Sequence, residues 1–258
     1  MTFRLLTYNI LKGGIGRIDK LAEVINASRP DLVLLQEATV PSAVAALAEK
    51  TGMADHRAFR QQSLGFMSRR PVAFSQWIRP RISRHAFLEV VPEGERLHVF
   101  GVHLSAVLAA WTEQRRRLEL RALLRSIAYH EGRLPVLAGD FNTIAPGERL
   151  DVGQLPLRVR PFMWVTGGRV RWRTIQTVLD AGYADVFRAL HPDDPGLTLP
   201  TSGAQIRLDY VFVPREQLTR VARCEVVRHS AAAQASDHFP VVADIEIGAP
   251  AQARERPA

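Results

Sequence analysis

The stretch from Pro135 to Thr143, which reads PVLAGDFNT, constrains the fold of this chain more than any other stretch. Its first half is a short apolar run behind a proline, which is typical of a strand buried on both faces. The run ends in Gly139, and Asp140 and Asn142 follow it two residues apart. If the extended backbone continues, both side chains face the same way. Gly, Asp and Asn are also common turn residues, so the stretch alone leaves a turn and a functional site equally open.

The composition describes a globular chain without an obvious internal boundary. Its 258 residues are 47% apolar and no Gly-, Ser- or Pro-rich linker divides them, which favours a single domain over residues 1–247 and a disordered tail over 248–258. The single cysteine, Cys224, excludes an intramolecular disulfide and fits a reducing compartment. The first residues show no signal-peptide pattern, and no apolar run approaches the roughly 20 residues of a membrane span. We therefore expect a cytoplasmic protein without a transmembrane segment and infer no obligate protein partner.

The charge is strongly positive and is carried almost entirely by arginine. The formal net charge is +8, and only Lys12, Lys20 and Lys50 among the 34 basic residues are lysines. The planar guanidinium suits phosphate, and an excess of positive charge is compatible with anionic partners. A preference for arginine over lysine can also reflect a GC-rich genome, so the charge gives limited support for such a partner.

Apolar periodicity predicts a chain of many strands with few, widely spaced helices. Strands are predicted over 3–9, 32–35, 64–68, 72–78, 86–91, 96–103, 207–213, 221–227 and 239–247, and helices over 17–28, 41–50, 107–130 and 174–180. This order favours two mixed sheets packed together with helices outside, rather than a Rossmann fold. Residues 145–171 fit no regular pattern and are either a functional loop or an insertion. The run Arg115-Arg116-Arg117 falls on the longest helix, where a solvated helix face is favoured over a binding site.

Polar side chains recur where the predicted strands end or begin and, in the case of Asp209, inside a predicted strand. They are Asn9, Glu37, His103, Asp140, Asn142, Asp209, Asp237 and His238. Each has an ordinary explanation by itself; for example, Glu37 could cap the next helix and Asp209 could pair with Arg207. Together they supply two histidines and enough carboxylate and amide oxygens for Mg²⁺ or Mn²⁺. The sequence contains no zinc-type Cys/His cluster, no GxSxG elbow and no P-loop.

Six short motifs around these residues resemble, in order, the motif set of the endonuclease/exonuclease/phosphatase superfamily, the fold of deoxyribonuclease I and the neutral sphingomyelinases. The motifs are Tyr8-Asn9, Leu35-Gln36-Glu37, Val102-His103-Leu104, Gly139-Asp140-Phe141-Asn142, Arg207-Leu208-Asp209-Tyr210 and Ser236-Asp237-His238. They span nearly the whole chain. The resemblance implies a four-layer α/β sandwich, in which two facing mixed β-sheets are flanked by helices and the site lies at their edge. It also implies metal-dependent hydrolysis of a phosphoester.

The resemblance further implies a role for each acidic and amide position. Glu37 corresponds to the principal metal ligand, with Asn9 beside it. Asp237 corresponds to a second carboxylate of the metal site or to one that supports a histidine. Asp140 and Asn142 correspond to the pair that positions the attacking water and the phosphoryl oxygens. Mg²⁺ or Mn²⁺ is the implied cofactor.

The two histidines also receive roles from the resemblance. His238 corresponds to the histidine that contacts the scissile phosphate, and Asp209 to the carboxylate that orients it and fixes its tautomer. His103 corresponds to the second histidine of the deoxyribonuclease-like branch. Either a carboxylate or a carboxylate-oriented histidine can activate water, so the identity of the general base stays open.

Local departures from the family pattern bear on the substrate. Ala38-Thr39 follows Glu37 where abasic-site endonucleases typically have Thr-Lys, which disfavours abasic-site repair. Near Ser68-Arg69 the chain lacks an Asn that is common in the family. Residues 158–173 interleave arginines with aromatic residues, a pattern that can hold phosphates and bases of single strands or can equally form an amphipathic hairpin. The candidate substrate contacts are Arg69, Arg169, Arg171, Trp172 and Arg173.

These observations favour a Mg²⁺-dependent phosphodiesterase, either an endonuclease or an exonuclease, that acts on nucleic acid. The alternative is a phosphatase or phospholipase C-type hydrolase of a small-molecule or lipid phosphoester, such as a phosphoinositide or sphingomyelin head group. A non-catalytic binding protein on the same fold is disfavoured, because every motif carboxylate and histidine is present.

Overall fold

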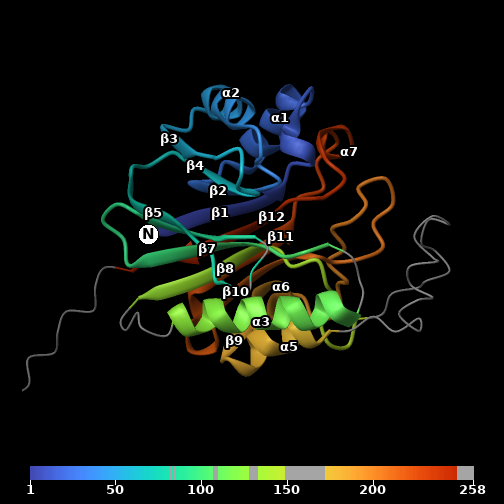
Figure 1. The fold of residues 1–258 in the computed structure, drawn as a ribbon. Coiled ribbons are helices and arrows are strands. Elements are labelled where there is room, and N and C mark those ends of the chain that lie inside the picture. The colour runs from blue at the N-terminus through green and yellow to red at the C-terminus, as the bar shows by residue number, and fades with distance from the viewer. Residues whose placement is uncertain (82, 84, 107–109, 128–132, 149–171, 249–258) are drawn as a thin grey trace, which may run out of the picture.

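Two six-stranded mixed sheets pack face to face, with helices on their outer faces (Figure 1). The computed structural model describes residues 1–248, except 82, 84, 107–109, 128–132 and 149–171. This arrangement confirms the predicted α/β sandwich. The predicted tail after residue 248 and most of the irregular stretch 145–171 lie outside the described residues.

The first sheet, sheet A, is ordered β11-β12-β1-β2-β4-β3. Its strands are β1 (Thr2–Asn9), β2 (Leu32–Gln36), β3 (Asp55–Arg57), β4 (Leu64–Ser68), β11 (Val221–Val226) and β12 (Val241–Glu246). Strands β1 and β2 are parallel, and their neighbours pair antiparallel. Because parallel strands end at the same edge, Asn9 and Glu37 come to one edge of the sheet.

The second sheet, sheet B, is ordered β5-β6-β7-β8-β10-β9. Its strands are β5 (Val72–Ile78), β6 (Phe87–Pro92), β7 (Leu97–His103), β8 (Leu134–Asp140), β9 (Tyr183–Asp185) and β10 (Asp209–Pro214). Strands β7 and β8 are parallel, with His103 opposite Asp140. Strand β10 runs antiparallel to β8, with Asp209 opposite Asp140. Three motif residues therefore lie side by side at one end of sheet B.

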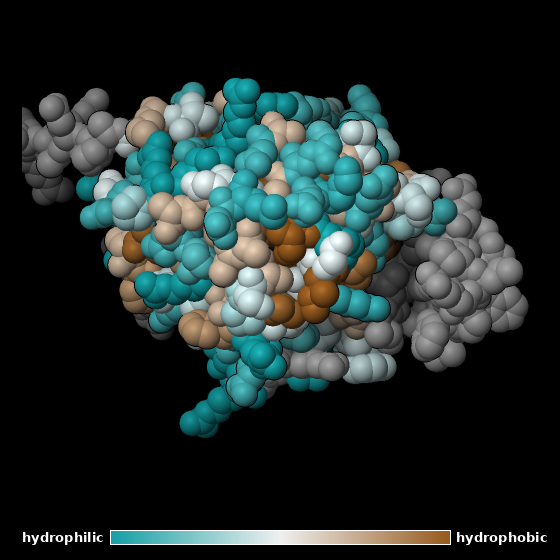
Figure 2. Space-filling view, turned by 90° about the horizontal axis from the view of Figure 1, so that it is seen from above, coloured by the Kyte–Doolittle hydropathy of each residue, from teal (hydrophilic) through white to brown (hydrophobic). Residues whose placement is uncertain are grey.

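Helices complete the four layers. Those described are α1 (Ile18–Ser28), α2 (Pro41–Thr51), α3 (Ala110–Ile127), α5 (Arg173–Asp180), α6 (Val186–Leu190) and α7 (Ala232–Ala235), with the 3₁₀ turns η1 (Lys12–Gly14) and η3 (Arg215–Arg220). Helices α1 and α2 cover sheet A, and α3 and α5 lie together against sheet B (Figure 1). Seen from above in Figure 2, the layer of α1 and α2 presents mostly hydrophilic side chains. None of the described helices is long and apolar enough to cross a membrane.

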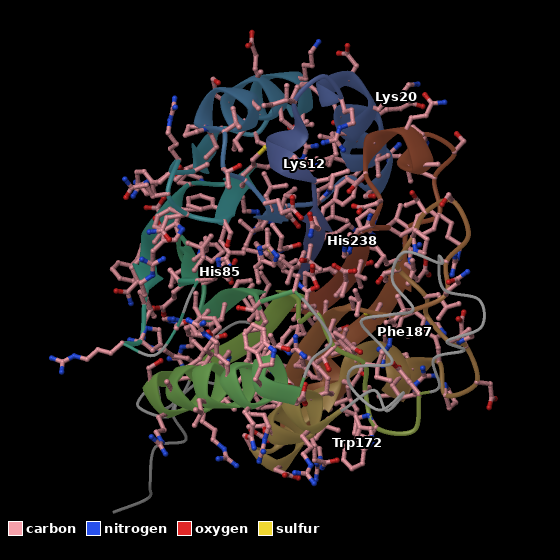
Figure 3. All side chains as sticks on the ribbon, turned by 45° about the vertical axis from the view of Figure 1, so that its right-hand side comes forward. Lys12, Lys20, His85, Trp172, Phe187 and His238 are labelled. Atoms are coloured by element: carbon pink, nitrogen blue, oxygen red, sulfur yellow. The ribbon has the colours of Figure 1, made fainter. Side chains whose placement is uncertain are left out.

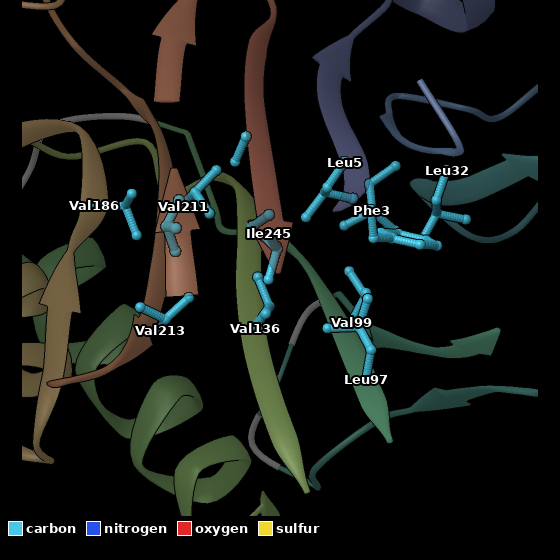
Figure 4. Close-up of a cluster of buried hydrophobic side chains, with 14 of the residues drawn as sticks. Phe3, Leu5, Leu32, Leu97, Val99, Val136, Val186, Val211, Val213 and Ile245 are labelled. Atoms are coloured by element: carbon cyan, nitrogen blue, oxygen red, sulfur yellow. The ribbon is translucent and has the colours of Figure 1, made fainter. Parts of the chain in front are cut away.

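The main hydrophobic core fills the space between the two sheets. Alternate residues of each strand point into it, among them Leu5 of β1, Val99 of β7, Val136 of β8 and Val211 of β10 (Figure 4). The intervening residues point outward and pack against the helices, as Leu6 does under α1 and α2. This two-residue period fixes which side chains reach the space between the sheets at the strand ends.

One prediction about α3 is wrong for Arg116. The run Arg115-Arg116-Arg117 was expected to form a solvated helix face, but the Arg116 side chain is only 1% exposed. Its guanidinium donates hydrogen bonds to the Ser105 carbonyl at 2.8 Å and to the Glu113 carboxylate at 3.1 Å. A buried carboxylate one turn earlier, invisible to a count of like charges, makes this burial possible.

Candidate active site

Side chains alternate between the two faces of a strand, so the inward-pointing core residues predict which residues at the strand ends also point inward. Leu5 points into the core, so Asn9, four residues on, points the same way. By the same count Val99 predicts an inward His103, and Val136 predicts an inward Asp140. Polar side chains from both sheets therefore meet where the apolar filling ends. A hydrogen bond joins the two sheets at this point, since Asn9 Nδ2 donates to Asp140 Oδ2 at 3.1 Å.

Asp140 is the buried centre of the site. Its two carboxylate oxygens accept hydrogen bonds from the Asn142 backbone N–H at 2.9 Å and from the Asn142 Nδ2 at 3.1 Å. The extended backbone does not continue through this stretch, since Asn142 has a φ of +51°. A tight turn, rather than a shared strand face, brings the two side chains together. Gly139 is required before it, because a Cβ there would lie 1.9 Å from the Val102 carbonyl oxygen.

His238 and Asp209 form a buried pair beside Asp140. The His238 Nδ1 lies 2.9 Å from Asp209 Oδ2, and its Nε2 lies 3.9 Å from Asp140 Oδ2. The segment before His238 is fixed by Ser236, whose hydroxyl donates to the Asn9 carbonyl at 2.6 Å and accepts the His238 backbone N–H at 3.3 Å. The imidazole is thus held between two carboxylates.

The ordinary explanation for Asp209, an ion pair with Arg207, does not apply. The Arg207 guanidinium is buried against Asp185, at 3.0 and 2.6 Å, and also contacts Glu148 at 2.8 Å. These contacts hold the start of β10 in place, so Arg207 supports the strand from which Asp209 projects.

His103 lies on the other side of Asp140, and a histidine missed by the sequence reading lies next to it. The His103 Nε2 is 3.9 Å from Asp140 Oδ2. The His85 ring stacks on the His103 ring with centroids 5.4 Å apart and an interplanar angle of 14°. In Figure 3, His85 and His238 both lie between the upper and lower helical layers, with His85 to the left of His238. The predicted hairpin of 86–91 with 96–103 was the available signal, because its register brings residue 85 close to His103.

Glu37 lies at the edge of sheet A and is half-buried. It does not cap α2, whose N-cap makes no side-chain hydrogen bond; instead its Oε2 accepts the Lys12 backbone N–H at 2.6 Å. Its φ of +57° is unusual for a residue with a side chain and costs on the order of 1 kcal/mol. Asp237 is also half-buried and adjoins His238 in the chain. Backbone strain of the kind seen at Glu37 is common at functional sites.

Burial and charge set the protonation states at the edge of sheet B. Burial lowers the pKa of His103 to about 3, and the charges of His85 and His238 act in the same direction. Burial alone would lower the pKa of His238, but its ion pair with Asp209 and the charge of Asp140 raise it to about 10. Burial raises the pKa of Asp140 to about 7, against the influence of His238. At neutral pH His103 is therefore neutral and His238 is an imidazolium.

Hard oxygen donors dominate the site and fit a divalent cation such as Mg²⁺ or Mn²⁺. Ligand atoms of Asp140, Asp209 and His238 lie within 4.8 Å of one another. His238 Nδ1 and Asp209 Oδ2 already form a hydrogen bond with each other and are therefore poor candidates for metal ligands. Asp140, Asp209 and His238 are better described as a group that transfers protons. Asp209 Oδ1 is buried without a hydrogen-bond partner among the described residues. The half-buried Glu37 carboxylate, next to Asn9, is the more accessible donor.

The structure does not bring the three described substrate-contact candidates, Arg69, Trp172 and Arg173, to the site. Arg69 follows β4, which is antiparallel to β2, so it lies at the opposite edge from Glu37 and donates to the Pro30 carbonyl at 3.0 Å. Trp172 and Arg173 stand at the start of α5, and Trp172 lies well away from His238 (Figure 3). Arg169 and Arg171 lie outside the described residues.

A buried network behind the site links the loops that follow His103 and Asp140. Besides pairing with Arg116, Glu113 accepts the Thr174 backbone N–H at 2.6 Å and lies 3.5 Å from the Thr143 hydroxyl. Arg116 in turn holds the Ser105 carbonyl. The Glu113–Arg116 ion pair on α3 therefore stabilises both loops.

Comparisons with known proteins agree with this fold. The model of the Endonuclease/Exonuclease/phosphatase family matches residues 6–238. A comparison with curated proteins finds no match.

Solved structures share the fold at low sequence identity. A 3′ phosphatase from Neisseria, solved with a product DNA hairpin, has 19% identity and a TM-score of 0.72, covering 95% of this chain and 99% of that one. An AP endonuclease from Archaeoglobus fulgidus has 16% identity and a TM-score of 0.73, covering 95% and 100%. An endonuclease/exonuclease/phosphatase from Beutenbergia cavernae has 21% identity and a TM-score of 0.67, covering 96% and 72%. At these identities the likeness concerns the fold.

Proposed function

This chain belongs to the endonuclease/exonuclease/phosphatase family, and from that premise we propose that it is a divalent-metal-dependent hydrolase that cleaves phosphoesters of DNA. One observation carries the proposal. A buried carboxylate, Asp140, lies between a neutral imidazole and an imidazolium, at a sheet edge that also presents Glu37. That set can bind an anionic phosphate and move a proton, which are the two requirements of phosphoester hydrolysis.

Glu37 and Asn9, with Asp237, would hold the cation. When bound, Mg²⁺ or Mn²⁺ would neutralise phosphate charge and stabilise the leaving oxygen. Asn9 also orients Asp140 through its amide, so the same side chain joins the cation side of the site to the proton-transfer side.

His238 acts as a donor to the phosphate rather than as a base. Its Nδ1 is engaged by Asp209, which leaves the Nε2–H directed toward the region of Asp140. Because its pKa of about 10 keeps it protonated at neutral pH, it contributes positive charge and a hydrogen bond to a phosphoryl oxygen. Asp209 fixes the tautomer and the ring orientation.

Asp140 is the general base in this proposal. Its pKa of about 7 matches the working pH, where a base is most efficient. Asn142 holds one carboxylate oxygen through its backbone N–H and also donates to the Leu104 carbonyl at 2.9 Å, which fixes the turn. The neutral His103, whose Nε2 lies 3.9 Å from Asp140 Oδ2, accepts or donates a hydrogen bond without adding charge.

DNA is the proposed substrate because of the chain's net charge of +8 and because two similar structures are described as a 3′ phosphatase with DNA and an AP endonuclease. Ala38-Thr39 after Glu37 still disfavours abasic-site cleavage.

A substrate panel tests the proposal. Supercoiled plasmid, single-stranded DNA, a 3′-phosphorylated oligonucleotide, an inositol phosphate and sphingomyelin would each be incubated with Mg²⁺, with Mn²⁺ and with EDTA. We expect metal-dependent hydrolysis of the DNA substrates by the wild type and its loss in Asp140→Asn. Intact DNA beside turnover of a small or lipid phosphoester would show that the alternative hydrolase function is correct.

A further inference from the structure

An arginine-rich groove runs along α3 and α5 to the starts of β7 and β8, the strand ends that lie away from the active site. It is formed by the facing sides of α3 and α5 and by the starts of β7 and β8, and has a volume of about 1030 Å³. Seven arginines and three carboxylates line it. The net charge of its lining is therefore half the formal charge of the whole chain.

The positive charge is organised along one helix. Arg117, Arg121 and Arg125 line the groove and follow one another at intervals of four residues on α3. Side chains at this spacing are neighbours on a helix face, and like charges there repel. Arg173, at the start of α5, adds a fourth guanidinium to the groove.

The structure offers this row little neutralisation. Arg121, Arg125 and Arg173 form no ion pair with any described residue. Of the lining carboxylates, Glu95 lies 3.5 Å from Arg70 and Asp180 accepts a hydrogen bond from Gln176 at 2.7 Å. A row of repelling charges without ion-pair partners among the described residues fits an external polyanion.

We infer that this groove binds the phosphate backbone of the DNA flank that extends from the active site. Helix α3 supplies the path, because it begins seven residues after His103 and leads away from the site to the groove. Strand β7 extends from the groove to the site, because Leu97 lines the groove and His103 lies at the site. At about 3.3 Å per residue, these two residues are about 20 Å apart. At the duplex spacing of about 3.4 Å per nucleotide along one strand, roughly six stacked nucleotides cover that distance. This inference rests on the proposed function for the identity of the ligand.

Flank length and salt dependence test the groove. Binding of fluorescent single-stranded DNA would be measured in EDTA by anisotropy, with flanks of about 3 and about 15 nucleotides on each side of the bound phosphate. For long flanks we expect the triple variant R117Q/R121Q/R125Q to reduce the slope of log K against log salt by about 2, since each lost phosphate contact contributes about 0.7. Short flanks should show no change.

A matched variant controls for net charge. K20Q/R29Q/K50Q removes the same charge from the opposite helical layer, at residues that do not line the groove. Equal slopes for both triple variants, or an unchanged slope for the α3 variant, would overturn the inference. Turnover of bis(p-nitrophenyl) phosphate should be the same in wild type and both variants, which confirms an intact active site.

The two proposals fail separately. If wild type turns over the small phosphodiester and cuts DNA but the α3 variant binds long flanks normally, the groove inference is wrong and the proposed function stands. If wild type cuts no DNA yet binds long flanks through the α3 arginines, the groove inference stands and the proposed function is wrong.

Discussion

The edges of the two sheets, which face each other across the site, differ in burial. Each sheet has six strands around one parallel pair, and each ends in polar motif residues. At the edge of sheet B, Asp140 and Asp209 are buried side by side with His238. At the edge of sheet A, Glu37 is half-buried on a left-handed turn.

This difference separates two kinds of chemistry. Burial shifts the pKa of Asp140 and His103 and makes the edge of sheet B suited to proton transfer and phosphate binding. The half-buried Glu37 can take up a hydrated cation without first losing all contact with water. Asn9 connects the two edges, since it belongs to β1 of sheet A and donates to Asp140 of sheet B.

The largest expected effect is at the buried edge. Asp140→Asn removes the proposed base while preserving most of the side-chain volume, and we expect kcat/KM on DNA to fall about 10⁴-fold. In the unmodified protein kcat/KM should rise with pH through about 7, as Asp140 loses its proton. DNA binding in EDTA serves as the control and should persist. More than a tenth of the activity remaining would exclude Asp140 as the base.

Glu37→Ala tests the other edge. We expect about a 10³-fold loss of metal-dependent activity, since a bound cation contributes several kcal/mol to transition-state stabilisation. Calorimetric titration with Mn²⁺ should show weakened binding, whereas the same titration of Asp140→Asn should change less. Metal binding that is weakened equally in both variants would mean that the two edges are not separate in function.

Asp209→Asn sharpens the assignment within the buried edge. Loss of the carboxylate lowers the pKa of His238 from about 10, so the alkaline limb of the pH–rate profile should move to lower pH. At neutral pH we expect about a 10²-fold loss of activity, with Mn²⁺ affinity unchanged. A marked loss of Mn²⁺ affinity would make Asp209 a ligand instead of an orienting group.

His103 gives the smallest expected effect, on stability. Its pKa falls from 6.5 in the unfolded chain to about 3 in the folded protein, so as pH drops below 6.5 the unfolded state binds the proton first. Stability should therefore fall between pH 6.5 and 3, by about 1 kcal/mol at about pH 5.5. Urea unfolding of His103→Asn should lack this loss, and the exposed His56→Asn should retain it. An identical pH dependence in all three proteins would show that His103 is not held neutral.

Much of the site was predictable because strand ends and motif order are local properties of a sequence. A two-residue period, followed from Leu5 or Val136, places Asn9 and Asp140 on inward faces. The order of the motifs then indicates the family. His85 could have been found from the hairpin register, although nothing in its immediate neighbours marks it.

Tertiary structure decided what depends on contacts between distant segments. The sequence alone could not show that Arg116 is buried, because the loop whose Ser105 carbonyl accepts its hydrogen bond is brought against α3 only by packing. It placed Arg69 at the site, but the antiparallel pairing of β4 with β2 carries Arg69 to the far edge. The sequence by itself determined which residues are available for chemistry. Only the fold decided which of them are buried together, and burial sets their protonation because a charge removed from water must be stabilised by its neighbours.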